Sequence, residues 1–220
     1  MSNCEYSLCC NACPILSVGW PILSLRPLVL MNRFWLNLDY CVLSGSGFSL
    51  ILQFVNSIYP MIRPLLLSDT PQILNIYRHY VEATTISFEL VPPTLEEMRQ
   101  RLALFLEQGS CWVCEEQGEI VGYCYSHPWK ERAAYHLTQE TTIYLAPQWQ
   151  GRGLGRQLML RLIESCRQRG CCALIACITA NNHASCRLHE ALGFKKVSHF
   201  ERVGYKLGQY LDVVDYELLL

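Results

Sequence analysis

The sequence has 220 residues, with 18 basic and 19 acidic side chains and a formal net charge of −1 at neutral pH. This balance disfavours a protein whose main task is to neutralise nucleic-acid phosphates or to coat an anionic membrane. Hydrophobic residues make up 51% of the chain, which is enough to bury a core and excludes general disorder. We therefore expect a small-molecule partner, with neither nucleic acid nor membrane involved.

Residues 1–60 differ in composition from the rest of the chain. They contain four charged side chains and none of the six histidines, but five of the 13 cysteines. A secretory signal is disfavoured because the first basic residue is Arg26. The uncharged run 42–59 is a poor membrane span because polar residues interrupt it. We expect residues 1–60 to be a poorly structured N-terminal extension, or sequence translated from too early a start codon, and residues 61–220 to be the functional domain.

Two cysteine pairs, Cys10 with Cys13 and Cys111 with Cys114, have the C-x-x-C spacing of zinc and redox sites. The second pair lies in a strand-like run, where positions i and i+3 point to opposite faces, and no further pair follows at the spacing of a zinc finger. We expect no metal site. Cysteines without a disulfide framework are typical of a reducing cytoplasm, where they serve as small apolar residues.

The first elements of the domain follow from local signals. A first strand is expected at 61–64, and helix caps with an early proline at 68–71 precede apolar residues spaced three and four apart, which predicts a helix. The capping box Thr94-Leu-Glu-Glu97 begins a second helix. Strands over 110–116 and 119–126 flank the hairpin signal Gln117-Gly118, and β-branched residues predict a strand at 140–145.

The second half contains a glycine loop, Gln150-Gly-Arg-Gly-Leu-Gly155, that runs directly into a helical pattern closed by Gly170. An apolar strand is expected at 173–179 and a short helix from about 184 to 192, before Gly193. Two last strands are expected near 195–202 and 213–219. The order β-α-α-β-β-β-α-β-α-β-β predicts a mixed sheet with helices on both faces, in the α/β (α+β) class.

The glycine loop between strand and helix suits a pyrophosphate. Its consecutive backbone N–H groups and the helix N-terminus favour negative charge, and Arg152 and Arg156 add cations. Glycines are also used in tight turns for purely conformational reasons, so the loop alone leaves both interpretations open. The spacing fits neither a Walker A motif nor a G-x-G-x-x-G fingerprint.

The same loop resembles the acetyl-CoA signature Q/R-x-x-G-x-G/A of the GNAT superfamily of N-acetyltransferases, and segment 182–194 resembles the family's second cofactor element. The resemblance implies the GNAT fold, in which helices flank a central, twisted, mixed β-sheet, and it implies acetyl-CoA as the cosubstrate. The cofactor-binding residues implied are Ile143, Tyr144, Leu145, Gln150, Gly151, Arg152, Gly153, Leu154, Gly155, Arg156, Asn182 and Ser185.

Within that superfamily, segments 85–89, 128–135, 140–145 and 203–212 resemble phosphinothricin acetyltransferases and the related enzymes that act on methionine sulfoximine or sulfone. The resemblance implies transfer of acetyl to the α-amine of an amino-acid-like molecule, by direct attack in a ternary complex. It also implies a resistance role, and it makes a homodimer the working hypothesis.

Acetyl transfer to an amine needs a neutral nucleophile, so a base must take a proton. The resemblance gives this role to Glu140 and gives His189 the role of proton donor to the leaving thiolate. Backbone amides at 143–145 are expected to stabilise the developing oxyanion, and an anionic acceptor calls for nearby cations. The substrate-binding residues implied are Phe88, Trp129, Lys130, Arg132, Tyr135, Thr141 and Thr142.

Plainer interpretations stay open for these residues. Glu140 could be an exposed strand-end glutamate, His189 could pack locally on its helix, and Lys130 and Arg132 could belong to a solvated loop. Three functions compete: acetylation of an amino-acid-like molecule, acetylation of a protein N-terminus or an aminoglycoside, and non-catalytic sensing of acetyl-CoA.

Overall fold

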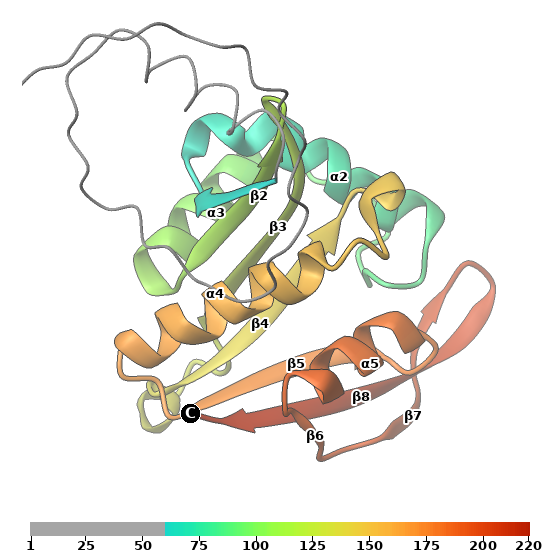
Figure 1. Cartoon of the computed structure of the whole chain (residues 1–220). Coiled ribbons are helices and arrows are strands. Elements are labelled where there is room, and N and C mark those ends of the chain that lie inside the picture. Colours follow the sequence, from blue (N-terminus) through green and yellow to red (C-terminus); the bar gives the residue numbers. More distant parts are fainter. Residues whose placement is uncertain (1–59) are drawn as a thin grey trace, which may run out of the picture. The chain divides into compact units, whose positions relative to one another are not determined.

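The computed structural model describes residues 60–220, which form an eight-stranded sheet with four main helices (Figure 1). The strands are β1 (Met61–Pro64), β2 (Cys111–Glu116), β3 (Glu119–Pro128), β4 (Thr138–Leu145), β5 (Ala173–Thr179), β6 (Lys195–Lys196), β7 (Phe200–Lys206) and β8 (Gln209–Leu219). The helices are α2 (Thr70–Ala83), α3 (Leu95–Gln108), α4 (Leu154–Gln168) and α5 (His183–Ala191). The strand order is β1-β2-β3-β4-β5-β8-β6, and β7 pairs with β8. The mixed sheet expected from the sequence is confirmed.

The helices cover both faces of the sheet, and each face has its own core. Helices α2 and α3 pack with Val113 and Tyr123 on one face, whereas α4 packs with Leu174 and Val214 on the other. Helices α4 and α5 cross the near face in Figure 1. Cys111 belongs to the first core and Cys114 to the second, so the two thiols lie on opposite faces, as the strand periodicity predicts.

Helix α3 begins as its sequence predicts. The Thr94 hydroxyl accepts from the Glu97 amide, and the Glu97 carboxylate accepts from the Thr94 amide. Helix α2 begins differently, because Asp69 at its N-cap makes no capping hydrogen bond. The Asp69 carboxylate instead accepts two hydrogen bonds of 2.8 Å from the Arg63 guanidinium and one from the Leu66 amide. This aspartate therefore ties β1 to the start of α2.

The parallel strands β4 and β5 are paired only at their first residues. The register runs from Thr138 opposite Ala173 to Glu140 opposite Ile175, a total of three pairs. Strand β4 then continues to Leu145 along β3, and β5 continues to Thr179 along β8. The sheet therefore opens between β4 and β5 immediately beyond Glu140.

The C-terminal strands differ from the prediction. The expected strand at 195–202 is two separate strands, β6 and β7, and the expected strand at 213–219 begins earlier, as β8 at Gln209. Strands β7 and β8 form a hairpin whose two turn residues, Leu207 and Gly208, have φ values of 50° and 77°. Both residues of a type I′ turn need positive φ, and the leucine gives no signal for it.

The prediction for residues 1–60 falls outside the described residues, apart from Pro60. Strand β1 begins at Met61, where the composition of the chain changes. Among residues 60–220, no helix has both the length and the apolar character needed to cross a bilayer.

Candidate active site

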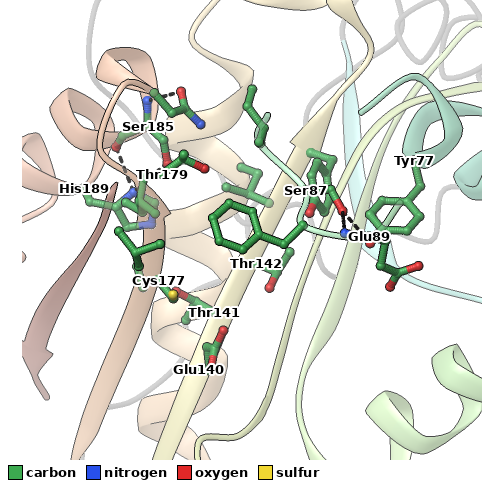
Figure 2. Close-up of a pocket in the computed structure, with 18 residues that line it drawn as sticks. Tyr77, Ser87, Glu89, Glu140, Thr141, Thr142, Cys177, Thr179, Ser185 and His189 are labelled. Atoms are coloured by element: carbon green, nitrogen blue, oxygen red, sulfur yellow. Dashed lines mark hydrogen bonds between the residues drawn. The ribbon is translucent and has the colours of Figure 1, made fainter. Parts of the chain in front are cut away.

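A cavity of about 490 Å³ opens where β4 and β5 diverge (Figure 2). Its walls come from β4, from β5, from α5, and from the segment between α2 and α3. The lining residues are Tyr77, Ile86, Ser87, Phe88, Glu89, Glu140, Thr141, Thr142, Ile143, Tyr144, Ala176, Cys177, Ile178, Thr179, Asn182, Ser185, His189 and Val213. The cavity thus unites Glu140, His189 and Phe88, which lie far apart in the sequence.

Strand β4 turns unpaired backbone amides toward this opening. The Ala146 amide donates to Val121 on β3, and strand alternation therefore directs the amides of Ile143 and Leu145 away from β3. Beyond Glu140 no β5 residue pairs with β4, so these two amides face the gap. The same alternation directs the Tyr144 amide toward β3. Two of the three amides expected to bind the cofactor are thus free to donate into the opening.

The glycine loop lies between β4 and α4. Gly151 and Gly153 have φ values of 74° and 79°, a conformation that other residues adopt only with strain. The Gln150 side chain donates to the Tyr80 hydroxyl, which in turn donates to the Leu145 carbonyl, so the loop is tied to the end of β4.

Helix α4 begins directly after this loop. Leu154 and Gly155 are buried in its first turn, whereas Arg156 is exposed, and the Arg152 guanidinium lies 4.4 Å from the centre of the Trp149 ring. The positive-φ glycines, the helix N-terminus and two exposed arginines suit a pyrophosphate. The free amides on β4 suit the amide-rich arm that is attached to the pyrophosphate in coenzyme A. These residues therefore fit acetyl-CoA.

Glu140 lies half-buried at the last paired position of β4. Burial raises the pKa of its carboxyl above the ordinary value, His127 opposite it on β3 counters this effect, and Asp215 on β8 adds to it. Next to it, the Thr141 hydroxyl donates to the Ile175 carbonyl, and Thr142 lies opposite Tyr125 of β3. Glu140 therefore has the position and the environment of a proton acceptor at the cavity.

His189 is almost completely buried, at 2% exposure, on the α5 side of the cavity. Its Nδ1 atom lies 2.8 Å from the carbonyl oxygen of Ser185, and its Nε2 atom is buried without a hydrogen-bond partner in the described structure. Burial lowers the pKa of the imidazole. At the start of the same helix, the Asn182 side chain accepts from the Ser185 amide at 3.2 Å, so Asn182 is the N-cap of α5.

The four expected substrate residues that follow β3 lie elsewhere. Lys130, Arg132 and Tyr135 line a separate cavity of about 500 Å³ together with Glu131. The Lys130 ammonium lies 3.8 Å from the centre of the Trp129 ring, and the Trp129 and Tyr135 rings meet edge to face. None of these residues lines the cavity that contains Glu140. The structure thus divides the expected substrate residues into two groups.

Several lining residues were missed by the sequence analysis. Ser87 and Glu89 lie in segment 85–89, so the motif on either side of Phe88 already contained them. Cys177 and Thr179 come from an apolar strand that carries no signal of a site. The only charged side chains among the lining residues are Glu89 and Glu140, and Glu89 is paired with Arg101. The cavity is therefore acidic. Within residues 60–220, no cluster of three or more His, Cys, Asp or Glu side chains could hold a metal ion.

Comparisons with known proteins agree with this geometry. Residues 73–194 match the acetyltransferase (GNAT) family. The chain is 41% identical to the phosphinothricin N-acetyltransferase of Alcaligenes faecalis over 148 residues, which cover 66% of this chain and 75% of the relative. It is 32% identical to the L-methionine sulfoximine/L-methionine sulfone acetyltransferase of Pseudomonas aeruginosa, over 72% of this chain and 94% of that one.

A solved structure shares the same fold. The phosphinothricin acetyltransferase of Sinorhizobium meliloti, in complex with acetyl-CoA, superposes with a TM-score of 0.71 at 31% identity, over 73% of this chain and 88% of that chain. The family match spans more than half of the 220 residues. The chain therefore belongs to the GNAT family and is an acetyltransferase.

Proposed function

We propose that this chain transfers the acetyl group of acetyl-CoA to the α-amine of an amino-acid-like small molecule of the phosphinothricin or methionine sulfoximine type, by direct attack in a ternary complex. One observation carries the proposal: Glu140 and His189, whose buried Nε2 has no hydrogen-bond partner in the described structure, line the same cavity, next to the free amides of β4. The relatives named above supply the class of acceptor.

The donor side of the site is built from backbone. Acetyl-CoA, when bound, supplies an acetyl group activated as a thioester. The loop 150–155 would hold its pyrophosphate, and the amides of Ile143 and Leu145 would donate to carbonyl oxygens lying in the gap. Because amides in a fixed strand need no reorganisation, this arrangement stabilises negative charge that develops on an acetyl oxygen.

Glu140 would take the proton from the acceptor's ammonium, directly or through water. A carboxyl with a raised pKa is a stronger base once ionised, and ionisation is needed before it can accept a proton. The acidic lining also attracts a positively charged amine into the cavity. Both effects favour delivery of a neutral amine to the reacting position.

His189 is better placed to accept a hydrogen bond than to donate one. A carbonyl oxygen only accepts, so the contact with Ser185 requires the proton to be on Nδ1 of His189. In the neutral ring, which burial favours, Nε2 then carries the lone pair, and it is buried without a partner in the described structure. We therefore assign to His189 the role of orienting the acceptor's ammonium or receiving its proton, in place of the proton-donor role expected from the sequence.

Direct attack is favoured over an acyl-enzyme. Cys177 is the one thiol among the lining residues. Desolvation, together with the carboxyls of Asp215 and Glu140, raises the pKa of this thiol to about 12. A cysteine nucleophile needs the thiolate, which is scarce at neutral pH when the pKa is so high. The thiol therefore lacks the activation that covalent catalysis requires.

The acid group of the acceptor has no cation in the main cavity. Lys130 and Arg132 remain the cations proposed for it, on the connection between β3 and β4. We also propose a cytoplasmic homodimer with a resistance role. The mass of the protein in solution tests the dimer, and growth on phosphinothricin tests the resistance.

The deciding experiment is a thiol-release assay with acetyl-CoA. Phosphinothricin, methionine sulfoximine and methionine sulfone are compared with common amino acids, an aminoglycoside and a peptide N-terminus, using the wild-type protein and Glu140→Gln. Turnover on the first three that falls at least about 100-fold in the variant supports the proposal. Preference for the aminoglycoside or the peptide contradicts an amino-acid-like acceptor. Binding of acetyl-CoA without any turnover favours non-catalytic sensing of acetyl-CoA.

A further inference from the structure

The Phe88 ring lies directly on the backbone of β7. A Cβ atom placed on Gly204 would lie 2.5 Å and 2.6 Å from two carbons of that ring, Cε2 and Cζ. Such distances are far below contact distance, so a side chain at position 204 would displace the tip of the Phe88 ring, which is 45% exposed. Gly204 has no positive φ, so the effect of a substitution there on the ring is steric. Phe88 is also a wall of the cavity that contains Glu140.

Lys206 lies two residues after Gly204, on the same face of β7. It contacts Ser87, the residue that precedes Phe88. Its side chain is 4% exposed, and its ammonium lies 2.6 Å from the Ser87 carbonyl oxygen and 3.5 Å from that of Tyr80. Within residues 60–220, no carboxylate forms an ion pair with it. Burial lowers the pKa of this lysine, and Glu89 partly offsets the effect. A buried ammonium is costly, and here its hydrogen bonds fasten the segment to β7.

The other side of the segment is fastened to the helices. The hydroxyl groups of Ser87 and Tyr77 lie 2.9 Å apart, and Glu89 pairs with Arg101 on α3. Figure 2 shows Ser87 and Tyr77 linked in this way at the edge of the cavity. Residues 87 and 89 are thus tied on both sides of Phe88, which fixes the backbone from which the ring projects.

We propose that Gly204 and Lys206 determine acceptor specificity by holding Phe88 as a fixed wall of the acceptor site. The inference rests on the proposed function, because it takes the cavity at Glu140 to receive the acceptor amine. Both are positioning residues and act through the segment 87–88. The fixed ring leaves room for a slender acceptor side chain, such as that of methionine sulfone, and excludes the broad side chain of an aromatic amino acid.

The test is a double-mutant cycle of Gly204→Ala and Phe88→Ala. Steady-state constants are measured for methionine sulfone and phenylalanine, with acetyl-CoA binding followed by calorimetry and folding by thermal melting. Gly204→Ala is expected to raise the KM for methionine sulfone about tenfold, with acetyl-CoA affinity unchanged. Phe88→Ala is expected to shift preference toward phenylalanine by a similar factor. Because both changes act on one contact, adding Gly204→Ala to Phe88→Ala should change KM less than about twofold.

A second pair of variants isolates the lysine. Lys206→Met keeps the length of the apolar stem and removes the ammonium, and Lys195→Met makes the same change at an exposed position of β6. Lys206→Met is expected to raise acceptor KM with kcat and acetyl-CoA affinity retained, whereas Lys195→Met should behave as the wild type. If Lys206→Met does not fold, the double-mutant cycle still decides.

The outcomes separate the inference from the proposed function. Wild-type turnover that Gly204→Ala leaves unchanged, or an effect of Gly204→Ala that persists in full without the Phe88 ring, overturns the inference alone. Absence of wild-type turnover on every amine overturns both. An increase in KM that depends on the ring supports the inference.

Discussion

The carbonyl oxygen of Ser185 accepts a hydrogen bond from Nδ1 of His189, one helical turn later on α5 and at 2.8 Å. This backbone contact fixes the tautomer of the ring before any substrate arrives. It leaves Nε2, which is buried without a hydrogen-bond partner among the described residues, unprotonated in the neutral ring. The main chain of α5 thus determines which nitrogen of the ring can accept a proton.

We predict that His189→Ala lowers kcat about 100-fold, because a group that transfers protons contributes at least that much. Nitrogen NMR of the labelled protein should show Nδ1 protonated and Nε2 unprotonated at neutral pH. His79→Ala, which removes an exposed imidazole from α2, serves as the control and should keep full activity. A proton on Nε2 in the resting protein would contradict the assignment.

The acidic limb of the pH profile of kcat/KM should follow the ionisation of the Glu140 carboxyl. Burial raises the pKa of its carboxyl, so the proton-accepting form is lost as pH falls through that raised value. Asp215→Asn removes a negative neighbour and should shift the acidic limb of kcat/KM to lower pH. Glu217→Gln changes the next acidic residue on the same face of β8 and should leave the limb in place. An unshifted limb in Asp215→Asn would exclude this electrostatic coupling.

The glycine loop should be sensitive to side chains. Alanine at Gly151 or Gly153 must adopt a positive φ at a cost of about 1 to 2 kcal/mol, and relief of that strain would turn the loop amides away. We expect acetyl-CoA to bind roughly tenfold more weakly, as measured by calorimetry. Gly170→Ala, with a φ of 80° at the end of α4, carries the same strain and should leave the affinity unchanged.

The β3–β4 connection offers a test of acceptor charge. Removing both cations with Lys130→Ser and Arg132→Ser should raise KM for phosphinothricin about tenfold or more and leave acetyl-CoA affinity unchanged. The dimethyl ester of the same acceptor, in which both the carboxylate and the phosphinate are esterified, should be much less affected. Equal effects on both acceptors would point to a structural role for these residues.

Asp69 should contribute to stability in a pH-dependent way. Burial alone would raise its pKa, but hydrogen bonds from Arg63 and the Leu66 amide outweigh burial and lower it below the ordinary 3.8. The carboxylate therefore stabilises the fold above that value, and this stabilisation is lost as pH falls through the lowered pKa.

We expect Asp69→Asn to lower the free energy of unfolding by about 2 kcal/mol at neutral pH and by less near pH 3. Urea titrations at both pH values measure the difference. Glu164→Gln disrupts an exposed ion pair with Arg167 and should cost less than about 0.5 kcal/mol. Equal losses for Asp69→Asn at both pH values would contradict the ionic origin.

The sequence predicted an element of this fold wherever a local signal was explicit. Gln117-Gly118 and Leu207-Gly208 adopt nearly the same pair of positive φ values, yet only the first was recognised as a hairpin. The polar glutamine before glycine, between two strand-like runs, is a local signal for a turn. Leucine gives no such signal, and its φ of 50° results from the pairing of β7 with β8.

The site was predictable in part, for a similar reason. The resemblance to family motifs gave Glu140, His189, Phe88 and the cofactor-binding residues, because each motif is a short run of consecutive residues. Phe88, Cys177 and His189 meet only through the tertiary fold, and the separation of Lys130 from Glu140 follows from the course of the chain after β3. Neither relationship has a local signature.

The short pairing of β4 with β5 also bears on the lifetime of the protein. Three residue pairs join two parts of the sheet, one ending at β4 and the other beginning at β5, with α4 packed across them. A molecule seated between these strands would replace the contacts that the missing pairs would have made. Ligand binding of this kind stabilises the native state in proportion to the logarithm of ligand concentration. The resistance of this enzyme to proteolysis would then rise with the concentration of acetyl-CoA in the cell.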